Sequence, residues 1–575
     1  MRSMNVKRRF YIEIERRGMM KKQTLAAGGL AVTMALALSA CGGQTKEETK
    51  AETPAATEQA AAGESTASGE TKDFFPLSDS VTVTIAGARD DSETPLGDRQ
   101  FFKDMEEKTN LKVDWIDWPQ SQVTEKRNLA FAGGELPDAM MGNFILDTAS
   151  LVKYGAEGWL MTWNDYINEE YMPNFYALCQ RAPGLLESIT AADGNIYGLP
   201  QFDYSIPDVT NETLIINTEW LEKVGMDMPT TTEELYQVLK AFKEAGDLNG
   251  NGKADEIPFT FLYNGGNNGQ LSFMGFTGLA YNNQHERICY KDGQIVYVPQ
   301  QEEYKEFLTY MNKLYSEGLV DPEVFTMTQA AYNAKVKTSE PTCGVISIWD
   351  AARVNAPIPG NDPEKEGVYQ YVLPLSGDNG VDPVWIPRYT PYNRSFCFVV
   401  SADTKYAEEL VRWADLHYDL DTSIQNSKGL IGTHIQEVGD RVYEELKKED
   451  GSAYTSAEKS EFVTLDDGMY GIAAGDCTIK QEVTPGSKAA ANELYKKYLN
   501  PNHAYTYALM SEEEAKQDSI LKQPLKDYVD QWTADFITNG NIDARWDEYL
   551  SGLDKLDVDK FVEMYSEIAS RSKVN

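Results

Sequence analysis

Hydrophobic and polar positions alternate at the start of the folded part of the chain. Segment 81–85 alternates valine and isoleucine with threonine, which predicts a strand. A helical pattern over 96–108 and a second strand over 111–116 follow. Another helical pattern over 124–131 leads through a Gly-rich turn to a short apolar segment at 139–143. This β-α-β-α-β order predicts a parallel sheet with right-handed crossovers.

The pattern continues past residue 200 with a strand at 213–217 and an amphipathic helix. A capping box marks the start of that helix, formed by Thr230 with Glu233 or by Thr231 with Glu234. Its apolar face has the i, i+3, i+4, i+7 spacing of Leu235, Val238, Leu239 and Phe242.

Two later apolar runs, at 343–349 and 396–400, predict buried strands. The C-terminal segment is helical in pattern. Its aromatic side chains predict a core that contains Trp532, Phe536, Trp546 and Tyr549.

The N-terminal segment has the features of a secretory signal. Lys21 and Lys22 precede an apolar run at 25–38, and Ser39-Ala40-Cys41 follows. The run is too short for a stable transmembrane helix. Leu38-Ser39-Ala40-Cys41 resembles a bacterial lipobox, which implies that Cys41 is diacylated and that 1–40 is removed. We expect translation to start at Met19 or Met20, and two acyl chains on Cys41 to give stable membrane anchoring.

A tether is expected between the lipid and the folded part. From Gly42 to about Lys72 the chain is mostly Ala, Thr, Glu, Gly and Ser, without an aromatic residue. Such a segment buries too little apolar surface to offset its ordering entropy, so 41–72 is interpreted as the lipidated cysteine and a flexible tether. The remainder, from Phe74 on, is long enough for two large lobes.

The net charge of −37 argues against nucleic acid as a partner, because phosphate binding needs a basic surface. Beyond Cys41 the five cysteines show no metal-like spacing, and one disulfide among them is left open. The four histidines are too scattered for a His-based metal site.

The segment 247–258 has the spacing of a calcium loop. Oxygen-bearing side chains stand at positions 1, 3, 5 and 9, glycine stands at position 6, and Pro258 replaces the usual Glu at position 12. Glu256 can supply the missing carboxylate. The alternative is an ordinary Asn/Gly/Asp surface loop. We expect a structural Ca²⁺ ion here.

Several segments together resemble the extracellular solute-binding proteins of family 1, and among them the large lipoproteins related to alginate-binding proteins. The similarity covers most of the chain after about residue 78. The matching segments are Leu38–Cys41, Gly134-Glu135-Leu136-Pro137-Asp138, Tyr197-Gly198-Leu199-Pro200, Asn217-Thr218-Glu219-Trp220-Leu221, the 247–258 loop and Ser401-Ala402-Asp403-Thr404-Lys405.

The resemblance implies an α/β, two-lobed periplasmic-binding-protein-like fold of type II with a hinge between the lobes. Lobe 1 is expected at 73–200 plus about 395–475, and lobe 2 at 201–394 plus about 476–575. The two expected hinge crossings follow 197–200 and Arg394. The family's calcium ligands correspond to Asp247, Asn249, Asn251, Lys253 through its carbonyl, Asp255 and Glu256.

Sugar sites combine aromatic platforms with planar hydrogen-bonding side chains, and ligands collect at strand ends in open α/β sheets. Residues of these types stand near predicted strand ends or near the expected hinges. The candidate sugar-binding residues are Trp115, Trp118, Asn143, Asp203, Tyr204, Trp349, Asp350, Trp385, Arg388, Tyr389, Tyr392 and Arg394.

We therefore expect a non-enzymatic, lipid-anchored protein on the extracytoplasmic face of the cell membrane. It would capture an oligosaccharide between two lobes and deliver it to an ABC permease, and the hydrolysis of ATP would occur on another chain. The alternatives are a secreted glycoside hydrolase, which needs two facing carboxylates, and a peptide-binding lipoprotein. A dockerin would need a second calcium loop. The acidic composition favours a neutral oligosaccharide over a polyuronate, although Arg353, Arg388 and Arg394 can offset it locally.

Overall fold

The computed structural model describes most of the chain from Phe74 to Arg571. The gaps are 90–92, 143–144, 183, 204–209, 211, 264, 266–268, 270–271, 282–285, 362–364, 386–394, 466–467, 481–482 and 501–507. Residues from Lys72 on form one compact unit. Of the helices in this described part, none is both long and apolar enough to cross a lipid bilayer.

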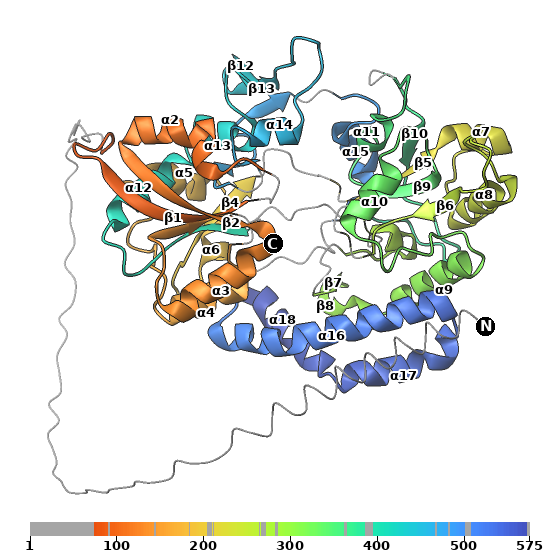
Figure 1. Cartoon of the computed structure of the whole chain (residues 1–575). Helices are drawn as coiled ribbons and strands as arrows, with labels where there is room; N and C mark the ends of the chain where they lie inside the picture. Colours follow the sequence, from red (N-terminus) through yellow and green to blue (C-terminus); the bar gives the residue numbers. More distant parts are fainter. Residues whose placement is uncertain are drawn as a thin grey trace, which may run out of the picture. The chain divides into compact units, whose positions relative to one another are not determined.

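The first sheet has six strands in the order β14-β4-β11-β3-β1-β2 (Figure 1). Its strands are β1 (Val81–Arg89), β2 (Leu111–Pro119), β3 (Ala139–Met141), β4 (Leu199–Asp203), β11 (Ser395–Val400) and β14 (Gly471–Ile472). β1 runs parallel to both β2 and β3, as the β-α-β-α-β pattern predicts. β11 lies between β3 and β4 and is antiparallel to both, so the sheet is mixed.

Helices and one small sheet accompany the first sheet. The helices are α2 (Gln100–Thr109), α3 (Val123–Gly133), α4 (Thr148–Ala156), α5 (Pro173–Arg181), α6 (Leu185–Ile189), α12 (Ala407–Leu416), α13 (Leu420–Lys428) and α14 (Ser456–Ser460). A three-stranded sheet consists of β12 (Ile435–Gly439), β13 (Val442–Glu445) and β15 (Thr478–Lys480). Phe101, Phe398 and Trp413 belong to the hydrophobic cluster of the six-stranded sheet.

The second sheet has four strands in the order β10-β5-β9-β6. Its strands are β5 (Thr213–Asn217), β6 (Ile257–Thr260), β9 (Cys343–Ile348) and β10 (Tyr369–Val372). All six residues of β9 are buried, which confirms the buried strand predicted from the apolar run. β9 pairs antiparallel with β5 and parallel with β6, so both of its edges are occupied.

The helices near the second sheet are α7 (Thr218–Val224), α8 (Thr232–Ala245), α9 (Glu302–Ser316), α10 (Gln329–Val336), α11 (Ala352–Asn355) and α15 (Lys488–Tyr495), and the hairpin is β7 (Ile288–Lys291) with β8 (Gln294–Tyr297). Of the two capping boxes that the sequence allows for α8, the structure forms the one between Thr231 and Glu234. α8 buries Leu235, Leu239 and Phe242, so the predicted apolar face is confirmed.

Three helices complete the chain, α16 (Glu512–Asn539), α17 (Ile542–Asp554) and α18 (Val558–Arg571). Phe536, Trp546 and Tyr549 are buried in the cluster of the second sheet, as predicted, and Trp532 packs against it half-buried. α16 also lies against α4. α4 therefore contributes to two cores, because Ala149 packs against the second cluster while Leu151 and Val152 belong to the first.

The chain passes from the first sheet to the second after β4 and returns to the first after β10, and after β15 it continues to α15 near the second sheet. Trp385 lies between the last strand of the second sheet and β11, and it is held from two directions. Its indole N–H donates to the Glu212 carbonyl at 3.0 Å, and its backbone N–H donates to the Tyr498 carbonyl. The boundaries expected for the two lobes stay a prediction.

Candidate functional site: the end of strand β9 and the loop at 247–256

The best-formed part of the candidate sugar site lies directly after β9. Trp349 is half-buried, and the Lys488 ammonium stands 3.7 Å from the centroid of its ring. The same ammonium donates to the Trp349 carbonyl at 2.8 Å. The cation and the hydrogen bond together hold the start of α15 against the end of β9. Sequence reasoning missed Lys488, because residues 349 and 488 are distant in the chain.

Asp350 is largely buried and is paired with Arg353. Its carboxylate accepts a hydrogen bond from the Arg353 backbone N–H at 3.0 Å and from the guanidinium Nε at 3.2 Å. Burial and, to a lesser degree, the charge of Arg353 lower the pKa of nearby Lys337. Three cationic side chains, Lys337, Arg353 and Lys488, therefore gather around Trp349 and Asp350 in a chain of net charge −37.

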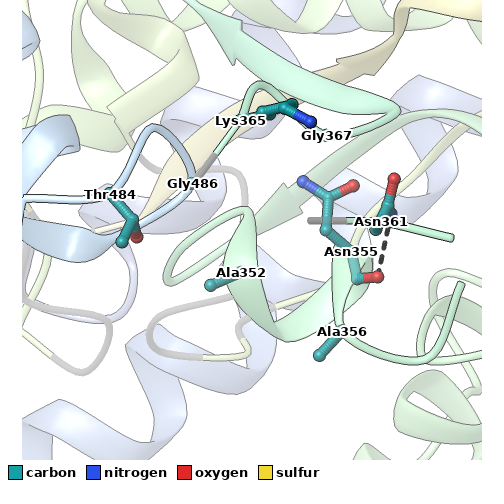
Figure 2. Close-up of a pocket in the computed structure, with 8 residues that line it drawn as sticks. All are labelled: Ala352, Asn355, Ala356, Asn361, Lys365, Gly367, Thr484 and Gly486. Atoms are coloured by element: carbon teal, nitrogen blue, oxygen red, sulfur yellow. Dashed lines mark hydrogen bonds between the residues drawn. The ribbon is translucent and has the colours of Figure 1, made fainter. Parts of the chain in front are cut away.

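A pocket of about 270 Å³ lies beside α11. Figure 2 shows that its described lining comes from α11 and the residue after it, from Asn361, Lys365 and Gly367, and from the turn 484–486. The lining residues are Ala352, Asn355, Ala356, Asn361, Lys365, Gly367, Thr484 and Gly486. None of them was a candidate in the sequence, since their segments carry no motif and meet only in the fold.

The structure places the other described candidates in packed or paired environments. Trp115 and Trp118 lie within β2, with the Trp115 ring 4.6 Å from that of Phe102 and Trp118 5% exposed in the core. Trp385 is 3% exposed and its ring packs against Tyr495. Asp203, at the end of β4, forms an ion pair with Lys428 at 3.1 Å. These positions give no direct support to sugar contact, and the assignment of all four stays a prediction.

The remaining candidates lie outside the described residues. They are Cys41, Asn143, Tyr204, Arg388, Tyr389, Tyr392 and Arg394. Their roles stay predictions.

The loop after α8 is curled by hydrogen bonds from its backbone to its own side chains. The Gly252 N–H donates to Asp247 Oδ2 at 2.9 Å, the Asn251 N–H to Asn249 Oδ1 at 3.0 Å, and the Lys253 N–H to Asn251 Oδ1 at 2.8 Å. Gly250 and Gly252 have φ of +77° and +81°, a region that glycine adopts without strain. These bonds therefore hold the loop in a compact turn.

Glu256 provides the observation that tests whether a cation fits this loop. Its Oε1 accepts the N–H groups of Leu248 and Asn249, but its Oε2 is buried without a hydrogen-bond partner. A buried carboxylate oxygen of this kind is what a hard cation satisfies. The Asn251 Nδ2 donates to Asp255 Oδ1 at 3.1 Å, while its Oδ1 accepts the Lys253 N–H.

Carboxylates alone do not define the loop as a metal site. Nowhere in the described chain do three or more His, Cys, Asp or Glu side chains gather in a metal-binding arrangement. The donor set of the loop is mixed, because two of its six members are amides and one is the Lys253 carbonyl. The residue types suit Ca²⁺, which prefers oxygen ligands, but the three carboxylates Asp247, Asp255 and Glu256 do not gather into a metal-binding group in this structure.

Two α/β sheets with separate cores, linked by several crossings of one chain, define a two-lobed solute-binding protein with a hinge. The chain belongs to the family of bacterial extracellular solute-binding proteins, whose family model matches residues 91–415.

Individual relatives agree with this family. The chain is 30% identical over 498 residues to the fructooligosaccharide ABC transporter substrate-binding protein FusA of Streptococcus pneumoniae, covering 84% of this chain and 88% of FusA. It is 27% identical to lipoprotein LipO of Bacillus subtilis, covering 64% of this chain and 70% of LipO.

Solved structures of solute-binding proteins share this fold. FusA in complex with kestose superposes with a TM-score of 0.73 at 26% identity, covering 85% of this chain and 99% of FusA. An EF-hand mutant of FusA with fructo-nystose superposes equally well. The alginate-binding protein AlgQ2, solved without calcium, shares the fold with a TM-score of 0.65 at 19% identity.

Proposed function

We propose that this protein captures an oligosaccharide between its two lobes and delivers it to the transmembrane permease of an ABC importer. The observation that carries the proposal is the match to FusA, a fructooligosaccharide-binding protein, over 84% of this chain and 88% of FusA. The crossings of the chain after β4 and after β10 supply connections about which two lobes can move. Ligand binding would favour the closed arrangement, which the permease recognises.

The sugar would lie against the end of β9. Trp349 offers an aromatic ring of limited exposure beside the Lys488 ammonium, and sugar sites combine such rings with polar side chains. In this proposal the protein binds and releases the sugar without cleaving it.

The chain would be anchored on the extracytoplasmic side of the cell membrane through lipid on Cys41. The sequence pattern at 38–41 and the similarity to a lipoprotein of Bacillus subtilis support this proposal. The long polar segment before Phe74 would let the binding unit reach a neighbouring permease.

The loop at 247–256 would hold one Ca²⁺ ion. Asp247, Asn249, Asn251, Asp255 and Glu256 would bind it through side chains and Lys253 through its carbonyl. The ion would supply no chemistry for sugar binding; it would neutralise the carboxylates and tie the end of α8 to β6.

Isothermal titration calorimetry on the unit Lys72–Asn575 tests the function. Kestose, nystose and oligogalacturonides are titrated in the presence of Ca²⁺, and the recovered sugars are analysed by chromatography. The proposal predicts saturable binding of at least one sugar, which is recovered intact. Shortened products would support a hydrolase instead, and binding of peptides but of no sugar would support a peptide importer.

A further inference from the structure

Hydrogen bonds hold Asn355 and Asn361, two described lining residues of the pocket beside α11. The Asn355 carboxamide pairs with the backbone N–H and carbonyl of Tyr369, both at 2.9 Å. Asn361 Nδ2 donates to the Asn355 carbonyl at 2.9 Å, a bond drawn in Figure 2. A preformed pocket binds without the entropic cost of ordering its side chains.

The third wall, the turn 484–486, is held in the same way. The Ala352 N–H donates to the Gly486 carbonyl at 2.8 Å. The Tyr371 hydroxyl contacts the carbonyl oxygens of Gly486 and Ser487 at 2.7 and 2.9 Å. This turn follows β14 and β15 in the chain, whereas α11 precedes them. The pocket is therefore completed only after the chain has returned from the first sheet.

Small residues keep the pocket open. A Cβ atom at Gly367 would collide with the Asn355 carboxamide, and one at Gly486 would lie 3.3 Å from the Ala352 nitrogen. The volume of about 270 Å³ is just below the range of roughly 300 to 1,000 Å³ that is usual for whole small-molecule sites. The pocket therefore has room for one ring rather than for a chain of rings.

The lining suits a hydroxylated ring. Methyl groups of Ala352 and Ala356 provide an apolar surface, and Asn361, Thr484 and Lys365 provide an amide, a hydroxyl and an ammonium group. The C–H face of a sugar and its rim of hydroxyls require this mixture.

The segments that line the pocket lie next to Trp349. Two hydrogen bonds of 2.8 Å join the same two segments in succession, from Lys488 to the Trp349 carbonyl and from Ala352 to the Gly486 carbonyl. We propose that this pocket is a terminal subsite, which holds the last ring of an oligosaccharide whose preceding ring lies on Trp349. This inference rests on the proposed function. It adds the residues that determine the length of the oligosaccharide that the protein binds.

A pocket-filling variant tests the subsite. Ala356 is exposed, so Ala356→Phe places a ring in the pocket without disturbing the core. Exposed Ala132, near the end of α3, provides the matched control Ala132→Phe. Calorimetry on Lys72–Asn575 with sucrose, kestose, nystose and oligogalacturonides should show that Ala356→Phe weakens binding of the longer sugars at least about tenfold and leaves the shortest bound sugar unaffected.

The outcomes separate the subsite from the function. If the parent binds sugars and Ala356→Phe binds every length equally well, the subsite is wrong and the function stands. If the parent protein binds none of these sugars, both the proposed function and the proposed subsite are wrong. Should Ala356→Phe not fold, Thr484→Val removes one hydroxyl from the lining, and it should reduce the affinity for the longer sugars severalfold.

Discussion

The Lys488 ammonium covers one face of the Trp349 ring, 3.7 Å from its centroid, and also donates to the carbonyl of the same residue. One face of the indole is therefore occupied by a cation of the protein itself. A sugar that stacks on Trp349 has to use the remaining face or the edge of the ring.

Replacement of Trp349 by alanine should weaken sugar binding by about 10- to 100-fold, because the stacked surface is lost. Lys488→Met keeps the aliphatic chain but removes the charge and the hydrogen bond, so we expect a smaller loss of about 2- to 10-fold. Calorimetry gives both values. Lys497→Met is the matched control, since Lys497 stands over another ring, that of Tyr498, at 4.7 Å. Equal affinity of the parent and Trp349→Ala would remove Trp349 from the site.

Removal of calcium should lower the stability of the folded unit. A ligand bound only to the native state stabilises it by about 2.7 kcal/mol at a hundredfold excess over its dissociation constant. Chelation should therefore lower Tm, and Ca²⁺ should restore it. Asp247→Asn should change Tm little in chelator, because Asp247 is exposed, but should abolish the response to Ca²⁺. Asp227→Asn, at an exposed position before α8, should keep the response. A loop that binds no ion would leave Tm unchanged by chelator.

The stability of the unit should depend on pH through His417. This side chain lies among Phe101, Phe102 and Trp413, and burial, with a smaller effect of Lys108, lowers its pKa from 6.5 to about 3. The unfolded chain then binds a proton that the folded chain does not bind. The contribution of His417 to the free energy of unfolding is complete above pH 6.5. It falls by roughly 1.4 kcal/mol per pH unit as the pH drops towards 3.

His417→Phe isolates this contribution to the pH dependence. Urea unfolding curves between pH 7 and pH 4 should show a shallower loss of stability for the variant than for the parent. Asp415 changes in the opposite direction, because burial raises its pKa to about 6 and makes its protonation favour the folded state at low pH. Its contribution is present in both proteins and cancels in the difference, so parallel profiles would contradict the role of His417.

Phenylalanine at Trp118 or Trp385 should lower stability, and it should also weaken sugar binding if the ring contacts the sugar as the sequence predicts. Trp118 is part of the first core, and Trp385→Phe removes the hydrogen bond to the Glu212 carbonyl, which contributes about 1 kcal/mol. Urea unfolding and calorimetry on the same samples separate the two effects. Lower stability with unchanged sugar affinity would remove these two residues from the predicted sugar site.

Local patterns in the sequence predicted local structure well. The parallel strands β1, β2 and β3, the capped start of α8 and the buried strand β9 follow from spacing and side-chain type alone. The antiparallel insertion of β11 between β3 and β4 does not, because it joins residues almost 200 positions apart without a local signal.

The site could be predicted only in part for a related reason. The apolar run at 343–349 placed Trp349 at a strand end, where the structure has it. The second strand was expected to end at residue 116, but β2 continues to Pro119 and takes Trp118 into the sheet. Trp115 and Trp118 are three positions apart, so their side chains point to opposite faces of the strand. The pocket depends on a contact between segments more than 100 positions apart, which periodicity cannot reveal.

α4 is shared by two cores, and this has a consequence for the order in which the protein unfolds. Leu151 and Val152 are buried in one cluster while Ala149 packs against the other, next to α16. A helix anchored on two sides is exposed to solvent only when both sets of contacts are broken, so partial opening of either cluster leaves it covered. Backbone amides in the middle of α4 should therefore exchange with deuterium as slowly as those of β9, and both helix and strand should open only with the whole unit.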